Sequence, residues 1–350
     1  MLRLDSATAF LLMSLALPGA AAAWDRGRVE TFAVLPDGAS GPEGLEVDGF
    51  GNVYAATFGF TAAGSATGEG QIFVFDRHGR FERQLSVAGS SPHLLGLRFQ
   101  PSTGKLLVID FGSGVVLDVN PRTGASTPFM TLPAALPHPG GAGLNDITFD
   151  RAGNVYVSDS FQGIIWKTGA AGGVASAWVD SDLLRTSGVP PFGANGIRMN
   201  RDESALFACN TGNDTVVEIP VDGGAAGTPV VFSNGVNGAD GLLIDDDDNL
   251  WVAANQADEI VVLDPGGKTI AKLGDFAGRT RRGAPVDLLF PASIRFSGHD
   301  LLVTNLALDL RLFSPAFVAG DSSFAADVSR YTISRLRARI PHVRDDDDDD

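Results

Sequence analysis

One short phrase recurs along this chain, as Pro-Glu-Gly-Leu at 42–45, Leu-Asn-Asp-Ile at 144–147, Ala-Asn-Gly-Ile at 194–197 and Ala-Asp-Gly-Leu at 239–242. Its second position, which we call the slot, always carries an oxygen-bearing side chain. The slot residues are Glu43, Asn145, Asn195 and Asp240. Each phrase is followed by a short apolar strand, a turn rich in Asp, Gly and Asn, and a second strand. If these repeats are arranged around one axis, the four slot side chains converge on one point.

Two further segments share this frame but carry an apolar slot residue, Leu95 within 92–99 and Ala292 within 290–296. Successive slots lie 45 to 52 residues apart, and a period of this size indicates radial or solenoid repetition. The fifth unit shows the strands best. Its strands are short, β-branched and bounded by Gly, Pro, Asn and Asp, at 241–245, 249–255, 259–264 and 269–273. Four strands in each of six units predict an all-β fold, a six-bladed β-propeller.

The two ends of the chain predict how the ring closes. The sixth unit offers only three strands, at 293–296, 301–305 and 331–336, and a spare strand lies before the first unit, at 29–35. We therefore expect the N-terminal strand to complete the last blade and to cover its open edge. Residues 24–340 then form one propeller domain. Residues 341–350 form an acidic tail, which we expect to be disordered because its like charges repel one another.

The first 23 residues have the pattern of an export signal. Arg3 gives a basic start, residues 7–17 are apolar, and three alanines at 21–23 precede Trp24. The apolar run is short for a bilayer span. We therefore expect an exported protein, periplasmic or secreted, with no stable membrane anchor after cleavage; a retained anchor is the alternative. The single cysteine, Cys209, excludes an internal disulfide.

The charge of the chain limits its partners. The formal net charge is −16, and residues 345–350 are a run of aspartates. An acidic chain without a basic patch argues against binding to nucleic acid or to anionic membranes. The expected partner is a small-molecule substrate, and we expect a monomer.

The slot residues have the chemistry of a metal site. Two carboxylates and two amide carbonyls are typical ligands of a hard divalent cation. We expect Ca²⁺, while Zn²⁺, Mn²⁺ and Mg²⁺ stay open; the five histidines are scattered and show no zinc spacing. Taken singly, each slot residue also fits a turn or a strand cap, but four in one register favour a ligand cluster. Three other Asp- and Asn-rich segments lack the calcium-loop frame, and we interpret them as hairpin turns, at 48–52, 150–154 and 245–249.

Residues near the slots could add catalytic or binding groups. His93 lies two residues before its slot. It is a candidate general base or substrate contact, and the alternative is an imidazole in a surface loop. Three long connections are predicted on the slot face, where they would set substrate size and supply an apolar wall, at 58–70, 181–194 and 307–330.

The order Glu, Asn, Asn, Asp across these repeats resembles the senescence-marker/gluconolactonase family. That family includes regucalcin-like lactonases and is similar to diisopropylfluorophosphatase and the paraoxonases. The resemblance spans residues 29–340, although 290–293 match the last-blade motif weakly and the paraoxonase histidine pair has no counterpart beyond His93. It implies that a catalytic divalent metal is bound by Glu43, Asn145, Asn195 and Asp240.

The resemblance also implies metal-assisted hydrolysis of a lactone or related ester. In that mechanism the cation polarises the carbonyl oxygen and stabilises the oxyanion. Asp240 orients or deprotonates the attacking water. Asn145 and Asn195 are neutral ligands and keep the net charge of the metal high.

Two other classes of function stay open. A non-catalytic propeller that serves as a binding scaffold predicts no preference for oxygen ligands in the slots. Another propeller enzyme, such as a strictosidine-synthase-like or lyase-type protein, is expected to place different residues at the channel. The substrate is not defined at this stage, because the loops at the channel mouth select it.

Overall fold

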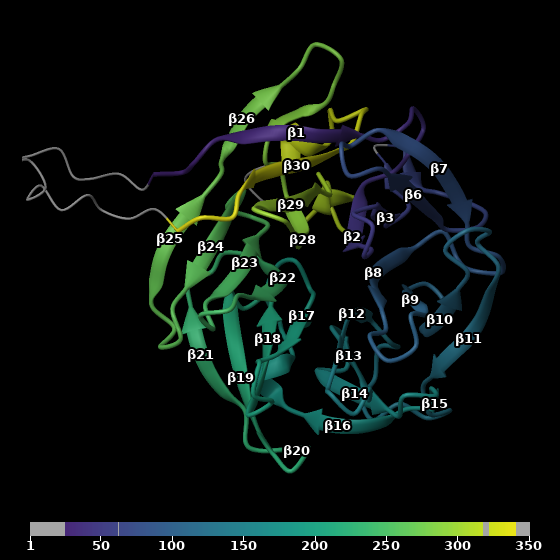
Figure 1. Cartoon of the computed structure of the whole chain (residues 1–350), viewed down its shortest axis with the longest axis vertical. Helices are drawn as coiled ribbons and strands as arrows, with labels where there is room; N and C mark the ends of the chain where they lie inside the picture. The colour runs from purple at the N-terminus through teal and green to yellow at the C-terminus, as the bar shows by residue number, and fades with distance from the viewer. Residues whose placement is uncertain (1–24, 62, 318–321, 341–350) are drawn as a thin grey trace, which may run out of the picture.

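The computed structural model describes residues 25–61, 63–317 and 322–340, which form six β-sheets around a central axis (Figure 1). The blades, each from the axis outward, are β2 (Pro42–Val47), β3 (Val53–Thr57), β6 (Gln71–Phe75) and β7 (Phe81–Ser86); β8 (Leu94–Phe99), β9 (Leu106–Asp110), β10 (Val115–Val119) and β11 (Ser126–Thr131); β12 (Leu144–Phe149), β13 (Val155–Asp159), β14 (Ile164–Thr168) and β16 (Ser176–Asp180); β17 (Ala194–Met199), β18 (Ala205–Asn210), β19 (Thr215–Asp222) and β21 (Val230–Asn234); β22 (Ala239–Ile244), β23 (Leu250–Ala254), β24 (Glu259–Leu263) and β25 (Thr269–Leu273); and β28 (Pro291–Ser297), β29 (Asp300–Asn305), β30 (Thr332–Arg337) and β1 (Val29–Val34). The predicted six-bladed propeller is confirmed.

Short strands and helical turns lie outside the four-stranded blades. The described residues add a hairpin of β4 (Phe60–Thr61) and β5 (Gly64–Ser65), a second hairpin of β26 (Phe276–Arg279) and β27 (Pro285–Asp287), the single strands β15 (Gly173–Val174) and β20 (Ala225–Ala226), and the helical turns η1 (Asp182–Leu184), η2 (Leu310–Leu312) and α1 (Ser322–Ala325).

The N-terminal strand closes the ring, as predicted. β1 pairs antiparallel with β30, from Val29 opposite Leu336 to Val34 opposite Thr332. In Figure 1 the purple β1 lies alongside the yellow β30 at the outer edge of the last blade. Strands from the two ends of the chain therefore share one sheet, and β1 protects an edge that would otherwise expose unpaired backbone groups.

The blades are held together by apolar packing between neighbouring sheets. The second strand of every blade is buried, except for Asp300 at the start of β29, as its run of Val, Leu, Ile, Ala and Trp residues requires. The Asp- and Asn-rich segments at 48–52, 150–154 and 245–249 are hairpin turns between first and second strands, as predicted. In each, the first aspartate accepts hydrogen bonds from the closing asparagine, as Asp150 does from Asn154 at 2.7 and 2.8 Å.

Two predicted segments cannot be compared with the structure. The export signal at 1–23 and the acidic tail at 341–350 lie outside the described residues. Within the described part of the chain, no helix is long and apolar enough to cross a membrane. Cys209 lies buried and unpaired in β18.

Candidate functional site

Each slot residue is the second residue of the innermost strand of its blade. Pairing with the second strand is interrupted at this point in all six blades. In β12, for example, Leu144 pairs with Asp159, and pairing then resumes only at Ile147. A bulge of this kind re-aims a side chain out of the regular alternation of the strand. The repeated bulge explains how residues from different blades reach one cavity.

In four of the six blades the residue after the slot is glycine, because the innermost strand of the next blade lies too close for a Cβ atom. A Cβ atom on Gly44 would lie 2.1 Å from the carbonyl oxygen of Leu95, the slot residue of the next blade. Gly96, Gly196 and Gly241 make equivalent close approaches. At two other blade junctions a hydroxyl contacts the next slot carbonyl, as Ser158 Oγ does when it donates to Asn195 O at 2.6 Å. The glycines thus allow close packing of the innermost strands and are not turn residues.

All four oxygen-bearing slot residues line one cavity near the axis. Its wall consists of Glu43, Phe58, Leu95, Asn145, Pro190, Phe192, Asn195, Thr211, Asp240, Asn255, Phe290, Leu306, Leu308 and Leu310. The cavity volume is about 30 Å³, which is room for about two waters or for an ion with one water. A larger substrate can enter only if some of these side chains move.

A second set of six equivalent residues, one at the end of the second strand of each blade, lies next to the slots. In each blade the residue that follows the second strand donates its backbone N–H to the carbonyl oxygen two residues before the slot, at 2.8 to 3.3 Å. This shared bond makes six positions equivalent, and we call them the second ring. They are Phe58, Phe111, Ser160, Thr211, Asn255 and Leu306.

The polar members of the second ring orient the slot asparagines. Asn195 Nδ2 donates to Thr211 Oγ1 at 2.9 Å, and that hydroxyl donates to Ala239 O at 2.7 Å. Asn145 Nδ2 contacts Ser160 Oγ in the same way at a longer 3.5 Å. Because the amide nitrogens are engaged, the amide oxygens remain available as acceptors or ligands.

Asn255 holds the carboxylate of Asp240. Its Nδ2 donates to Asp240 Oδ2 at 2.8 Å, and both side chains are buried. Burial raises the pKa of Asp240 to about 8, against the lowering effect of this hydrogen bond. Sequence reasoning missed Asn255 and its equivalents, although in every blade they lie 14 to 16 residues after the slot.

Glu43 is the slot residue without such support. Its second-ring neighbour is Phe58, and among the described residues its buried Oε2 atom has no hydrogen-bond partner. Burial, and then the charges of Asp240 and Asp146, raise the pKa of Glu43 well above its usual range. Within the described residues neither Glu43 nor Asp240 forms an ion pair. Two buried, unpaired carboxylates and two oriented amides are a donor set that fits a divalent cation.

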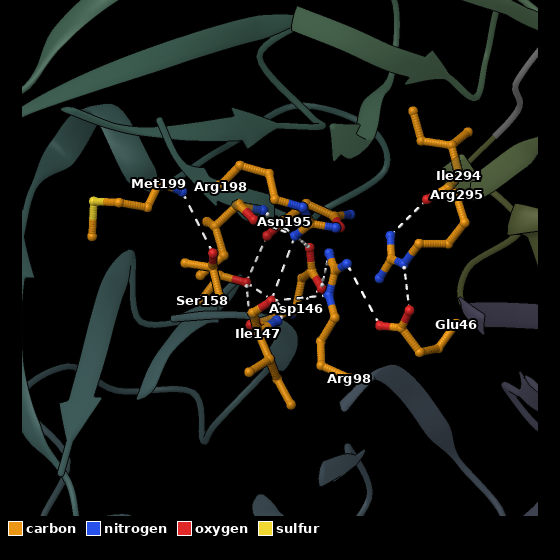
Figure 2. Close-up of polar contacts among 12 residues, drawn as sticks. Glu46, Arg98, Asp146, Ile147, Ser158, Asn195, Arg198, Met199, Ile294 and Arg295 are labelled. Atoms are coloured by element: carbon orange, nitrogen blue, oxygen red, sulfur yellow. Dashed lines mark hydrogen bonds and ion pairs between the residues drawn. The ribbon is translucent and has the colours of Figure 1, made fainter. Parts of the chain in front are cut away.

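Charged side chains from the innermost strands of several blades contact one another (Figure 2). Arg98, Arg198 and Arg295 each stand three residues after a slot, as does Glu46. Asp146 lies between Arg198, at 2.7 Å, and Arg98, at 3.5 Å. Glu46 lies between Arg295, at 3.5 Å, and Arg98, at 3.8 Å. These arginines are therefore engaged with other acids, and burial lowers the pKa of Arg98 to about 10.

His93 is not brought to the cavity. Its Nδ1 lies 2.7 Å from Phe58 O, its Nε2 lies 3.1 Å from Ser65 Oγ, and its ring stacks on Phe60 at 4.7 Å. It is absent from the cavity wall. The bulge directs the slot residue toward the axis, whereas a residue two positions earlier meets the hairpin of blade 1. His93 thus lies beside the cavity-lining Phe58, and its role in catalysis stays a prediction.

The three long connections predicted on the slot face do contribute to the cavity wall, through Phe58, through Pro190 and Phe192, and through Leu308 and Leu310. Aromatic rings pack around this wall with centroids 4.8 to 6.3 Å apart. We call this group the phenylalanine cover. It consists of Phe58, Phe60, Phe111, Phe161, Phe192 and Phe313.

The profile of the family described as SMP-30/Gluconolactonase/LRE-like region matches residues 89–274. This match covers more than half of the chain and includes three of the four oxygen-bearing slots. The chain belongs to this family of β-propeller proteins, as its slot pattern predicted. Among proteins with curated descriptions, none matches the sequence.

Solved structures share the fold. A gluconolactonase from Xanthomonas campestris superimposes with a TM-score of 0.61 at 13% identity, covering 90% of each chain. Regucalcin from Agrobacterium tumefaciens, described as a calcium-binding protein, gives 0.59 at 17% identity over 87% of this chain and 94% of its own. Virginiamycin B lyase from Staphylococcus aureus gives 0.52 at 12% identity over 89% and 99%. At these identities the likeness establishes the propeller architecture alone.

Proposed function

We propose that this protein hydrolyses a lactone or related ester and works with a divalent cation, most simply Ca²⁺. One observation carries the proposal. Glu43, Asn145, Asn195 and Asp240, from four different blades, line one cavity in which the two buried carboxylates form no ion pair with any described residue. Membership of the SMP-30/gluconolactonase family supports this assignment. A plain binding scaffold gives no reason to bury such a set of oxygens.

These four side chains would hold the cation. When bound, it would supply positive charge that stabilises the negative charge developing on the substrate's carbonyl oxygen. The asparagines suit this role because Thr211 and Ser160 engage their nitrogens and leave the amide oxygens for the cavity. Being neutral, they do not cancel the charge of the ion.

Asp240 would act as the general base. Asn255 fixes one oxygen of its carboxylate, Oδ2, so the orientation of the group toward the cavity is set before substrate binds. The carboxylate accepts a proton from water as the water oxygen bonds to the carbonyl carbon. The ring C–O bond then breaks, and the proton passes to the leaving alkoxide. The product is a hydroxy acid, and Asp240 is again ionised.

The test combines metal analysis with an activity panel. The mature protein, purified without chelator, is analysed for bound metals, and hydrolysis of lactones and aryl esters is measured before and after EDTA treatment. We expect one tightly bound divalent cation per chain and loss of hydrolysis in EDTA that the matching metal restores. If the untreated protein hydrolyses none of these compounds faster than the EDTA-treated protein does, the hydrolase proposal is wrong and the binding-scaffold function replaces it.

We also propose that residues 1–23 are removed on export and that the mature protein acts as a monomer on small molecules outside the cytoplasm. The pattern of basic, apolar and small residues in this segment supports export. N-terminal sequencing of protein from the extracytoplasmic fraction, and light scattering of the purified chain, test the two parts separately.

A further inference from the structure

The second ring divides the cavity into two unlike halves. In blades 3, 4 and 5 it carries the hydrogen-bonding residues Ser160, Thr211 and Asn255. In blades 6, 1 and 2 the same position carries Leu306, Phe58 and Phe111. The polar second-ring residues therefore occupy three consecutive blades and the apolar ones the other three, and of these Thr211, Asn255, Phe58 and Leu306 line the cavity.

The slots follow the same division, with one exception. The polar half holds Asn145, Asn195 and Asp240, whereas blades 2 and 6 place Leu95 and Ala292 in the slot, both fully buried. Glu43 is the exception, because it stands in the apolar half beside Phe58. Its Oε2 atom has no hydrogen-bond partner in the part of the chain that the structure describes. The difference between the two halves therefore arises at two positions of each blade, the slot and the second-ring position.

The connection after β29 enlarges the apolar half. Leu308 and Leu310 line the cavity next to Leu306. Phe58 lies at the centre of the phenylalanine cover, with ring centroids 4.8 Å from Phe60, 5.5 Å from Phe111 and 6.2 Å from Phe313. A substrate that enters must therefore meet aromatic and aliphatic side chains on this side of the cavity.

This surface discriminates between two kinds of lactone. A sugar lactone carries several hydroxyl groups, and in the apolar half they would lose water without gaining a partner. Each such loss costs on the order of tenfold in affinity. An alkyl or aryl group gains affinity in the same place, because apolar area leaves water. The polar half remains able to receive the carbonyl group.

We propose that the substrate is a lactone or ester bearing an apolar group, alkyl or aryl, which lies against Phe58, Leu306 and Leu308 while its carbonyl faces Asn195 and Asp240. The inference rests on the proposed hydrolase function and specifies its substrate class. Phe58 and Leu306 are the specificity-determining residues. They replace, in the apolar half, the polar residues that the equivalent positions carry in blades 3 to 5.

The activity test compares δ-decalactone with D-glucono-δ-lactone. We expect the wild-type enzyme to favour the alkyl lactone in kcat/KM by at least about tenfold, with the preference growing with chain length. Phe58→Ser and Leu306→Asn introduce residues found at equivalent positions, and each should lower this preference by about tenfold. Phe50→Ser is the control, because Phe50 is 87% exposed in the turn at the far end of β2. It should leave the ratio unchanged.

Phe58 and Leu306 are buried, so a less intrusive variant accompanies them. Phe313 is 36% exposed and packs on Phe58 and Phe60. Phe313→Ala should keep the melting temperature close to that of the wild type and still reduce the preference for the alkyl lactone. A wild-type enzyme that cleaves D-glucono-δ-lactone better than δ-decalactone would overturn the inference and leave the hydrolase function intact.

A binding measurement separates the two proposals. Calorimetry with the lactam analogues of both compounds reports affinity without hydrolysis. If the alkyl lactam binds more tightly, and Phe313→Ala weakens it, the apolar half is a ligand site even where no lactone is cleaved; the hydrolase proposal alone would then fail. If the sugar lactam binds more tightly, or Phe313→Ala leaves the alkyl lactam unaffected, the substrate class proposed here is wrong.

Discussion

Asn255 and Asp240 form a hydrogen bond of 2.8 Å between the second and first strands of blade 5, with the amide nitrogen donating to Oδ2 of the carboxylate. Both residues line the cavity, and Asn255 Oδ1 is buried without a partner. The bond fixes one face of the carboxylate without neutralising its charge. A positioned but ionisable carboxylate is what a general base requires.

Asn255→Ala removes this support and leaves Asp240 in place. Because groups that orient a ligand or base change affinity or activity by about 10- to 100-fold, we expect hydrolysis to fall within that range. Metal affinity should weaken in parallel, measured by titration of the metal-free protein. Thr211→Ser, which keeps the hydroxyl contacted by Asn195, is the matched control and should stay within about threefold of the wild type. Wild-type rates in Asn255→Ala would show that the hydrogen bond is only structural.

His93→Ala tests whether the histidine acts as a base or as a support for the cover. The ring bridges Phe58 and Ser65 and stacks on Phe60, so its loss should loosen the wall near Phe58. We expect KM to rise a few fold, while the pH profile of kcat keeps its shape. A pH profile of kcat that changes shape, with kcat reduced about a hundredfold, would instead support His93 as a general base.

The sequence predicted the parts of the site that the repeat itself encodes. Glu43, Asn145, Asn195 and Asp240 share one register, so a repeat of about 50 residues was enough to bring them together. Asn255 was missed because its role depends on the end of the second strand, and the distance from the slot to that end varies from 14 to 16 residues between blades. The position of His93 depends on the hairpin β4–β5, which belongs to another blade and is not part of the repeat.

The arginines of the channel illustrate the same limit. Arg98, Arg198 and Arg295 stand at one offset from their slots, so their convergence was readable from the repeat. Their partner Glu46 stands at the same offset, whereas their other partner, Asp146, does not. Asp146 lies one residue after a slot, where four other blades carry glycine, and it reaches Arg198 only because β12 and β17 are adjacent in the ring.

Arg198→Met should destabilise the propeller. It leaves Asp146 buried with a single arginine, Arg98, at 3.5 Å. Breaking a buried ion pair from one side costs about 3 kcal/mol, so the free energy of unfolding in urea should fall by roughly that amount. Arg151→Met is the control, because its pair with Glu203 is exposed and such pairs contribute less than about 1 kcal/mol. Equal losses in both variants would contradict a structural role for the channel network.

Asp258 makes the free energy of unfolding depend on pH, and a single substitution can measure its contribution. Its Oδ1 accepts a hydrogen bond from the backbone N–H of Phe290 at 2.7 Å, and burial raises its pKa to about 6. The folded protein therefore holds a proton more tightly than the unfolded chain, whose carboxyl has a pKa near 4. This contribution to stability is full below pH 4 and is lost as the pH rises through 6.

Asp258→Asn keeps an acceptor for Phe290 and removes the titration. Relative to the wild type, the variant should gain stability between pH 4 and pH 7, by on the order of 2 kcal/mol. Unfolding free energies of both proteins at several pH values measure this difference. A difference that stays constant over the range would show that Asp258 titrates normally.

Asp240→Asn separates metal binding from catalysis. The substitution keeps the size of the side chain and one oxygen for the cation, but it removes the group that accepts the proton. We expect the variant to bind metal more weakly than the wild type and to hydrolyse lactones about a hundredfold more slowly or worse, the usual effect of a lost general base. Asp245→Asn is the matched control, because Asp245 lies in the turn at the other end of β22 and holds Asn249 and Trp251. It should leave turnover within about twofold. Normal turnover in Asp240→Asn would remove Asp240 as the base, and a wild-type rate that survives complete metal removal would exclude the metal-assisted mechanism while leaving the propeller fold unaffected.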